Sequence, residues 1–217
     1  MIALAKPVEH VPAGSLATLR RLAADCQACP LWRHATQTVF GRGPSHAAAM
    51  LLGEQPGAQE DLAGEPFVGP AGQLLDRALA EAGLDRRTLY LTNTVKHFKY
   101  ELRGKVRLHK RANATEQAAC RQWLAAELAR VQPRLVIGLG AMAAQTLFGK
   151  DFRIGSERGR WRELGPHTRG LATWHPSAVL RTPREARRHE AYAELVTDLR
   201  ELAAALAALS DAERAAR

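Results

Sequence analysis

The chain has 217 residues, and its 31 basic and 22 acidic side chains give a formal net charge of +9. This length is enough for one substantial core, and no linker rich in Pro, Ser or Gly divides it, so we expect a single domain over residues 1–217 with loose tails at 1–13 and about 209–217. No apolar run approaches the ~20 residues of a membrane span, and the apolar opening is too short for a signal-peptide core, so we expect a cytoplasmic protein without a membrane partner. Nothing in the sequence indicates an oligomer, and we expect a monomer.

The predicted elements alternate between strands and helices. The first half of the chain contains a helix at 15–26 capped by Ser15, a strand at 47–52, a loop at 64–72, a helix at 73–82 and a strand at 89–92. A long exposed loop follows at 96–113. The second half contains a helix at 115–131, a strand at 135–137, a strand-to-helix turn at 138–144, a strand at 171–174 and a helix from about 185. The last helix presents one apolar stripe, which should cover a face of the sheet. This order predicts a three-layer α/β/α fold with a central four-stranded parallel sheet.

Polar side chains follow the predicted strands at the point where each one ends. The first strand is closed by Gly53-Glu54-Gln55-Pro56-Gly57, the second by Asn93, the third by Gly138 and the fourth by His175-Pro176-Ser177. Because ligands of open α/β sheets bind at the carboxyl ends of the strands, these residues should converge on one pocket. Each of them also has an ordinary structural alternative: Glu54 could cap a helix, Asn93 could form a turn, and His175 could be a core histidine with satisfied hydrogen bonds.

The excess positive charge is concentrated in two segments. One contains Arg103, Lys105, Arg107, Lys110 and Arg111, and the other contains Arg181, Arg184, Arg187 and Arg188. Such patches most often bind a polyanion, and nucleic acid is the commonest one. The alternative is a solvated surface without a ligand.

Three cysteines and one histidine form a candidate metal site. An odd number of cysteines argues against a disulfide framework. Cys26 and Cys29 have the spacing of a two-thiolate clip, Cys120 lies near the start of a predicted helix, and His97 stands just past a strand end. Together they would complete a four-ligand site for zinc or for an iron-sulfur cluster. The alternative is a buried packing role for Cys120 and a surface position for His97.

The motifs in this order resemble those of the uracil-DNA glycosylase superfamily, in particular its iron-sulfur family four. The matching segments are Cys26 to Cys29, Gly53 to Gly57, Pro66 to Gly72, Asn93 to Lys96, Ala119 to Arg121 and His175 to Ser177, and the resemblance spans residues about 20 to 200.

Two departures from ordinary family four members point to the UdgX-type branch. His97 stands where the third cluster cysteine would be, and a basic loop, Gly104 to Lys110, is inserted before the fourth ligand. The branch motif in this loop is Lys-Arg-Arg-Ile-His, so Val106 replaces an arginine and puts one phosphate contact in doubt, whereas His109 is retained.

The resemblance implies a role for each motif. The expected cofactor is a 4Fe-4S cluster held by Cys26, Cys29, His97 and Cys120. The expected partner is uracil-containing DNA, either single-stranded or with the uracil extruded from a duplex. Phe67 would stack on the uracil, Asn93 would read its edge, and the remaining expected substrate contacts are Gln55, Gly57, Arg107 and Ser177.

The resemblance also implies the catalytic groups. Glu54 would oppose the positive charge that develops on the sugar, and His175 would donate to the departing uracil. His109 resembles the branch's nucleophile, which attacks the anomeric carbon and leaves a covalent protein–DNA adduct. The sequence leaves open a conventional glycosylase of family four that turns over, and, from another class, a DNA-lesion-binding module without catalysis.

Overall fold

A computed structural model of the chain describes residues 4–215. Its centre is a five-stranded sheet with the strand order β2-β1-β5-β7-β6. The strands are β1 (Ala49–Gly53), β2 (Tyr90–Asn93), β5 (Leu135–Leu139), β6 (Arg162–Gly165) and β7 (Thr168–Thr173). The first three and β7 are parallel, and β6 pairs antiparallel with β7. The predicted α/β/α class is confirmed, but the prediction of four strands missed β6, an edge strand in which only Leu164 is both apolar and buried.

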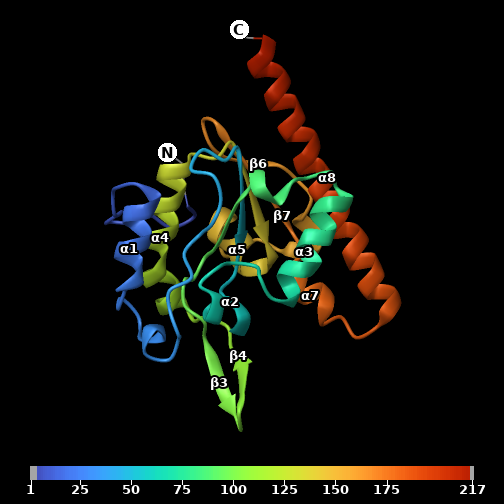
Figure 1. Cartoon of the computed structure of the whole chain (residues 1–217). Coiled ribbons are helices and arrows are strands. Elements are labelled where there is room, and N and C mark those ends of the chain that lie inside the picture. The colour runs from blue at the N-terminus through green and yellow to red at the C-terminus, as the bar shows by residue number, and fades with distance from the viewer. Residues whose placement is uncertain (1–3, 216–217) are drawn as a thin grey trace.

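Helices cover both faces of this sheet (Figure 1). The helices are α1 (Leu16–Ala24), α2 (Ala58–Ala63), α3 (Pro70–Glu81), α4 (Ala114–Val131), α5 (Gly140–Phe148), α6 (Ile154–Glu157), α7 (Pro176–Leu180) and α8 (Glu185–Ala215), with short 3-10 turns at Pro30–Arg33 and Arg86–Thr88. Leu51 of β1 packs in a cluster with α3, α7 and α8, whereas the neighbouring Leu52 packs with α4 and α5. This alternation of side chains buries both faces of the strand.

The segment 96–113, predicted as a long exposed loop, has a different structure. Its first residues, Lys96 to Phe98, are buried, and it then forms a hairpin of β3 (Tyr100–Arg103) and β4 (Val106–His109). The strands were missed because they are short and mostly exposed, so they show no core-facing alternation. Gly104, with φ of 61°, occupies the turn, as the first central position of a two-residue hairpin turn requires.

Two further boundaries differ from the prediction. The helix predicted at 73–82 begins at Pro70, because proline at the first helical position has a suitable φ and needs no hydrogen-bond acceptor. Residues 209–215, expected as part of a loose tail, continue helix α8, and the tail positions 1–3 and 216–217 lie outside the described residues. Of the helices in the described part of the chain, none combines the length and the hydropathy that a membrane crossing requires.

Candidate functional site

The carboxyl ends of β1 and β2 place Asn93 and Phe67 against each other. Gly53 is paired in register with Asn93, and the pairing continues where Val95 N–H donates to the Glu54 carbonyl. A Cβ on Gly53 would lie 2.3 Å from Asn93 Oδ1 and 2.6 Å from Phe67 Cζ. Only glycine at this position therefore lets the amide and the aromatic ring meet above the end of β1.

Phe67 has a backbone conformation that bulky residues rarely adopt, with φ of 58°. Arg86 and Gly72 allow it to be held there. Arg86 Nη2 donates to the carbonyls of Pro66 and Phe67, both at 3.1 Å, while its Nη1 contacts Asp76 Oδ1 at 2.5 Å. A Cβ on Gly72 would lie 1.9 Å from the Phe67 carbonyl oxygen, so glycine is required there too. Strained residues held in this way are typical of binding sites, and sequence reasoning missed Arg86 because its contacts are distant in the chain.

Glu60 is a second residue that the sequence analysis missed, and it joins two loops of the site. Its carboxylate accepts from Gly57 N–H at 3.1 Å, from Val68 N–H at 3.0 Å and from Gly69 N–H at 2.7 Å. It therefore fixes the loop after β1 to the loop that carries Phe67. The spacing of Gly57 and Glu60, which is that of a capping box at the start of α2, is the signal that could have found it.

His175 presents a buried donor to the same region. Its Nδ1 accepts from Ser177 N–H at 3.1 Å and lies 2.8 Å from Ser177 Oγ, so the proton of the neutral ring is on Nε2. Burial, together with the charges of Arg181 and His109, lowers the pKa of His175 to about 4, so the ring is neutral at pH 7. Its Nε2 is buried and has no partner among the described residues. The ring lies 6.2 Å from that of Phe67, measured between centroids. A free N–H donor therefore faces the space beside Phe67.

Glu54 lies at the end of β1 with a quarter of its side chain exposed. Burial raises the pKa of this carboxyl, while Arg111 and Arg181 oppose the shift. Arg111 Nε is 3.9 Å from Glu54 Oε1, which is too long for a hydrogen bond. The capping residue of the following helix is Gly57, so the helix-cap alternative for Glu54 is wrong.

His109 lies at the end of β4, where the hairpin meets the body. The residue is exposed to solvent, but its ring packs 6.0 Å from that of Phe98, and desolvation is the main cause that lowers its pKa. The charge of Arg181 lowers the pKa further, and Glu60 opposes this. The imidazole is therefore neutral near pH 7, which a nucleophile requires.

Gln55 and Arg107, which we expected to contact a ligand, bind the protein itself. Gln55 accepts from Ala112 N–H at 2.8 Å and donates to the Lys110 carbonyl at 2.9 Å. Arg107 Nη1 lies 2.7 Å from the buried Asp61 carboxylate. Both side chains hold the hairpin on the body, because the hairpin has too little apolar burial of its own to stay there. In this structure the two residues support the hairpin that carries His109, and their contact with a ligand stays a prediction.

Cys29 and Cys120 are buried in one cluster, and the partly buried Cys26 packs against it. Lys96 N–H donates to Cys120 Sγ and Trp123 Nε1–H donates to Cys26 Sγ, both at 3.1 Å. Burial raises the pKa of Cys120 to about 12 and also raises that of Cys29. No group of three or more His, Cys, Asp and Glu side chains within residues 4–215 has the geometry that holds a single metal ion.

His97 is buried, so the alternative of a surface histidine is wrong. Thr38 Oγ1 donates to the Ala23 carbonyl at 2.8 Å, and the same carbonyl accepts from Cys26 N–H. The Thr38 hydroxyl has thus used its proton and must accept from His97 Nε2–H, which is 2.9 Å away. This tautomer leaves the lone pair of Nδ1 available as a ligand.

An ion pair without solvent exposure lies between the cysteines and Asn93. Lys96 Nζ is 2.6 Å from Glu127 Oε2 and also donates to the Asn93 carbonyl at 2.6 Å. Glu127 in turn accepts from Gly41 N–H, Tyr90 Oη–H and Thr92 Oγ1–H. A buried pair persists only when its remaining donors and acceptors are satisfied in this way. It fixes the backbone from which the Asn93 side chain extends.

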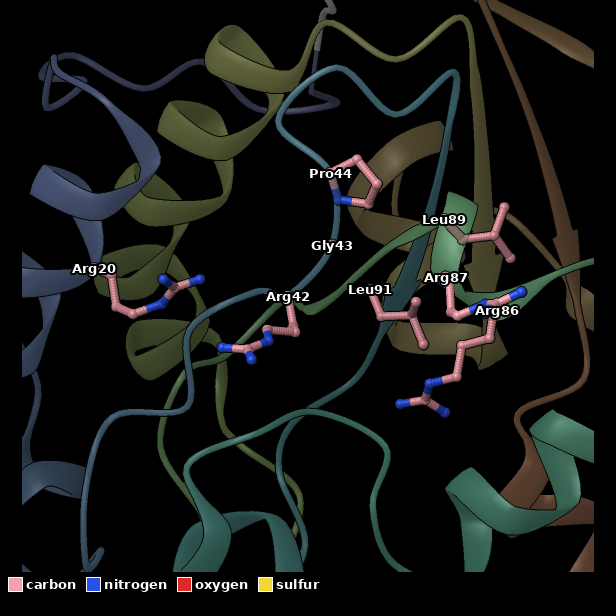
Figure 2. A pocket seen from close by; sticks show the side chains of 8 residues that line it. All are labelled: Arg20, Arg42, Gly43, Pro44, Arg86, Arg87, Leu89 and Leu91. Carbon is pink, nitrogen blue, oxygen red and sulfur yellow. The ribbon is translucent and has the colours of Figure 1, made fainter.

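A groove of about 500 Å³ lies along the outer edge of the sheet, beside β2 (Figure 2). Its lining residues are Arg20, Arg42, Gly43, Pro44, Arg86, Arg87, Leu89 and Leu91. Arg42 and Arg87 are paired with carboxylates, those of Glu65 and Asp85. The groove contains none of the predicted site residues, so its excess of arginines does not mark the candidate site.

Comparison with known proteins identifies relatives of this chain. A profile described as the uracil DNA glycosylase superfamily matches residues 40–200. A type-4 uracil-DNA glycosylase of Pyrobaculum aerophilum is 35% identical over 77% of this chain and 86% of its own length. An enzyme of the same name from Saccharolobus solfataricus is 36% identical over 73% of this chain and 74% of its own length. Another, from Archaeoglobus fulgidus, is 34% identical over 81% of this chain and 88% of its own length.

Proposed function

This chain belongs to the uracil DNA glycosylase superfamily, and from that premise we propose that it excises uracil from DNA and then captures the sugar covalently through His109. The observation that carries the proposal is the buried, unpartnered Nε2–H of His175, which lies beside Phe67 and Asn93 at one edge of the sheet. A neutral donor there can bind a uracil carbonyl oxygen.

Recognition of the base follows from the residues around this donor. Phe67 supplies an aromatic face for stacking, and the Asn93 amide supplies one donor and one acceptor for the edge of the pyrimidine. Because a base inside a duplex cannot reach such a pocket, the nucleotide is extruded or comes from a single strand. Gly57 and Ser177 line the adjoining hollow, where the backbone can approach the nucleotide.

Cleavage breaks the bond between C1′ of the sugar and N1 of uracil, and both electrons leave with the base. The departing uracil anion is stabilised by the His175 donor, and the positive charge on the sugar is opposed by ionised Glu54. The lone pair of neutral His109 then forms a C–N bond to C1′, and the ring's own N–H proton is released to solvent. In conventional turnover, water supplies the electron pair instead.

A denaturing gel tests this proposal against both alternatives. The purified protein is incubated with an oligonucleotide that contains one uracil. We expect a band of lower mobility that survives heating in denaturant. A free strand with an abasic site would indicate conventional turnover, and an unchanged strand would indicate a binding module without catalysis.

We also propose that Cys26, Cys29, Cys120 and His97 hold a 4Fe-4S cluster. The fit rests on the shared buried position of the cysteines and on the free lone pair of His97 Nδ1. Three thiolates and an imidazole are iron-sulfur ligands, and replacement of a thiolate by an imidazole tends to raise the reduction potential. The site is separate from the base pocket, so we propose a structural role.

The cluster proposal predicts that anaerobically purified protein is brown and contains iron and acid-labile sulfide. Cys120→Ser should remove most of the iron and lower the melting temperature, because the remaining ligands Cys26, Cys29 and His97 would be left without their metal. Metal analysis, the visible spectrum and thermal unfolding measure these changes. A colourless protein with stoichiometric zinc would contradict the assignment.

The contact between Arg86 and the Phe67 loop predicts a selective loss of uracil binding. Arg86→Gln removes the donor to the Pro66 and Phe67 carbonyls, so the strained loop should relax and free uracil should inhibit the reaction about tenfold more weakly, which corresponds to roughly 1.4 kcal/mol. The matched control is Arg87→Gln, since Arg87 contacts Asp85 and not the loop. Inhibition constants measured on both variants check the prediction, and equal constants would contradict it.

A further inference from the structure

The two residues that precede His175 are bound to helix α8. Thr173 Oγ1–H donates to Asp198 Oδ2, and Trp174 Nε1–H donates to Glu194 Oε2, both at 2.5 Å. The two carboxylates lie about one turn apart on α8. The end of β7 is therefore attached to α8 immediately before the chain reaches His175.

A single cation joins the two carboxylates. Arg158 Nη1 lies 2.6 Å from Asp198 Oδ2, and Arg158 Nη2 lies 3.0 Å from Glu194 Oε1. The guanidinium also lies over the Trp174 ring, 5.9 Å from its centroid. The planar fork of an arginine can hold two carboxylates in a fixed geometry, whereas the ammonium group of a lysine is a point charge on a flexible stem.

This cluster of Arg158, Glu194 and Asp198 is largely shielded from water. The side chain of Asp198 is 5% exposed and that of Arg158 is 19% exposed. Burial raises the pKa of the Asp198 carboxyl, although Thr173 and Arg158 oppose the shift. Like charges one turn apart on a helix also repel each other. Because a buried ion cluster adds little net stability compared with apolar side chains of similar size, a role in fixing local geometry explains it better.

The His175 ring depends on its neighbours in the chain for its position. Ser177, on the C-terminal side, binds Nδ1, whereas the Nε2 donor has no partner among the described residues. A Cβ on Gly140 would lie 2.8 Å from His175 Cβ, so the turn after β5 packs closely against the residue. On the N-terminal side, Thr173 and Trp174 are the residues that fix the backbone. A donor stabilises a developing anion only when it is held at hydrogen-bond distance from it.

Resting on the proposed function, we propose that Arg158 is a positioning residue for the departure of uracil: through Glu194 and Asp198 it fixes the end of β7, and so it holds His175 Nε2–H where the negative charge develops. Arg158 contacts neither the base nor the sugar in this role. Without the guanidinium, the two carboxylates repel each other and release Trp174 and Thr173. The resulting shift of the donor is costly, because a displacement of about 1 Å can slow a reaction by ~10²-fold.

The test is a double-mutant cycle between Arg158 and His175, with single-turnover release of uracil from an oligonucleotide as the measurement. The variants are Arg158→Met, His175→Ala and the combination of both. We expect Arg158→Met to slow release about tenfold, and His175→Ala to slow it more. The double variant should be no slower than His175→Ala, because Arg158 acts only through the donor that His175→Ala removes.

The matched control is Arg162→Met, which should leave the rate unchanged. Like Arg158, Arg162 is paired with a carboxylate, that of Glu157 at 2.7 Å, and lies over an aromatic ring, that of Phe152 at 5.2 Å. It belongs to β6 and not to the cluster.

An oligonucleotide with 5-fluorouracil in place of uracil gives a second readout. Fluorine stabilises the departing anion, so this base needs less help from His175. The loss caused by Arg158→Met should therefore be smaller on 5-fluorouracil, whereas partial unfolding would slow both substrates equally. Trp174→Phe removes only the indole donor to Glu194 and keeps an aromatic ring. It should show the same pattern with a smaller loss, and it replaces Arg158→Met in the cycle if that variant does not fold.

Four results would overturn the inference. They are a double variant that is slower than His175→Ala, equal losses on uracil and 5-fluorouracil, an equal loss from Arg162→Met, and unchanged rates for both Arg158→Met and Trp174→Phe. In each of them the wild-type protein releases uracil, so the proposed excision stands while the inference fails. A wild-type protein that releases no uracil would overturn the proposed function, and the inference with it.

Discussion

Replacing His109 with serine should abolish the denaturant-resistant protein–DNA band and leave uracil release in place. The substitution removes the lone pair that attacks C1′, but Glu54, Asn93 and His175 still stabilise departure of the base. Water then captures the sugar, and the product becomes an abasic strand. A denaturing gel, with separate quantification of free uracil, measures both products.

The matched control for this experiment is His189→Ser, because His189 is an exposed histidine on α8, away from the hairpin. It should form the adduct as the wild type does. The adduct yield of the wild type should also fall at a lower pH than the protonation of an ordinary histidine would cause, because desolvation lowers the pKa of His109. An adduct formed by the His109→Ser variant would place the nucleophile elsewhere.

The sequence predicted the strand-end residues of this site because each follows an apolar run. Asn93, Glu54 and His175 could be located by that local signal alone, and the parallel sheet then brings them together. Phe67 could be named only from the motif resemblance, because its unusual φ depends on the clamp by Arg86 and on the space at Gly72. No local pattern encodes such a contact.

The hairpin shows a second limit of sequence reasoning. Its strands lack a buried face, so hydrophobic periodicity predicts a loop, and its position depends on single pairs such as Arg107 with Asp61. The same limit explains why the contacts of Gln55 and Arg107 with the protein itself were not predicted. A polar side chain near a site can bind either the ligand or the neighbouring chain, and only the folded structure distinguishes these.

Replacing Glu54 with glutamine should slow uracil release and adduct formation together, by about 10² to 10³ in rate. The amide keeps the shape of the side chain but removes the negative charge that opposes the sugar cation. In the wild type, the rate should fall as pH decreases through the pKa of Glu54, and this fall should begin at a higher pH than for an ordinary glutamate, because burial raises that pKa. The pH profile of Glu54→Gln should lack this acidic limb.

The stability of the same variant separates a catalytic role from a structural one. A carboxyl whose pKa is raised on folding stabilises the fold below its unfolded pKa, and this contribution is lost as pH rises through the folded pKa. At pH 7 the ionised Glu54 therefore destabilises the fold, and the neutral glutamine should melt at the same temperature as the wild type or slightly higher. The control Glu65→Gln changes an exposed carboxylate that pairs only loosely with Arg42, and it should leave the rate unchanged. If Glu54→Gln lost activity together with several degrees of melting temperature, the carboxylate would be structural, and the charge opposing the sugar cation would have to come from another group.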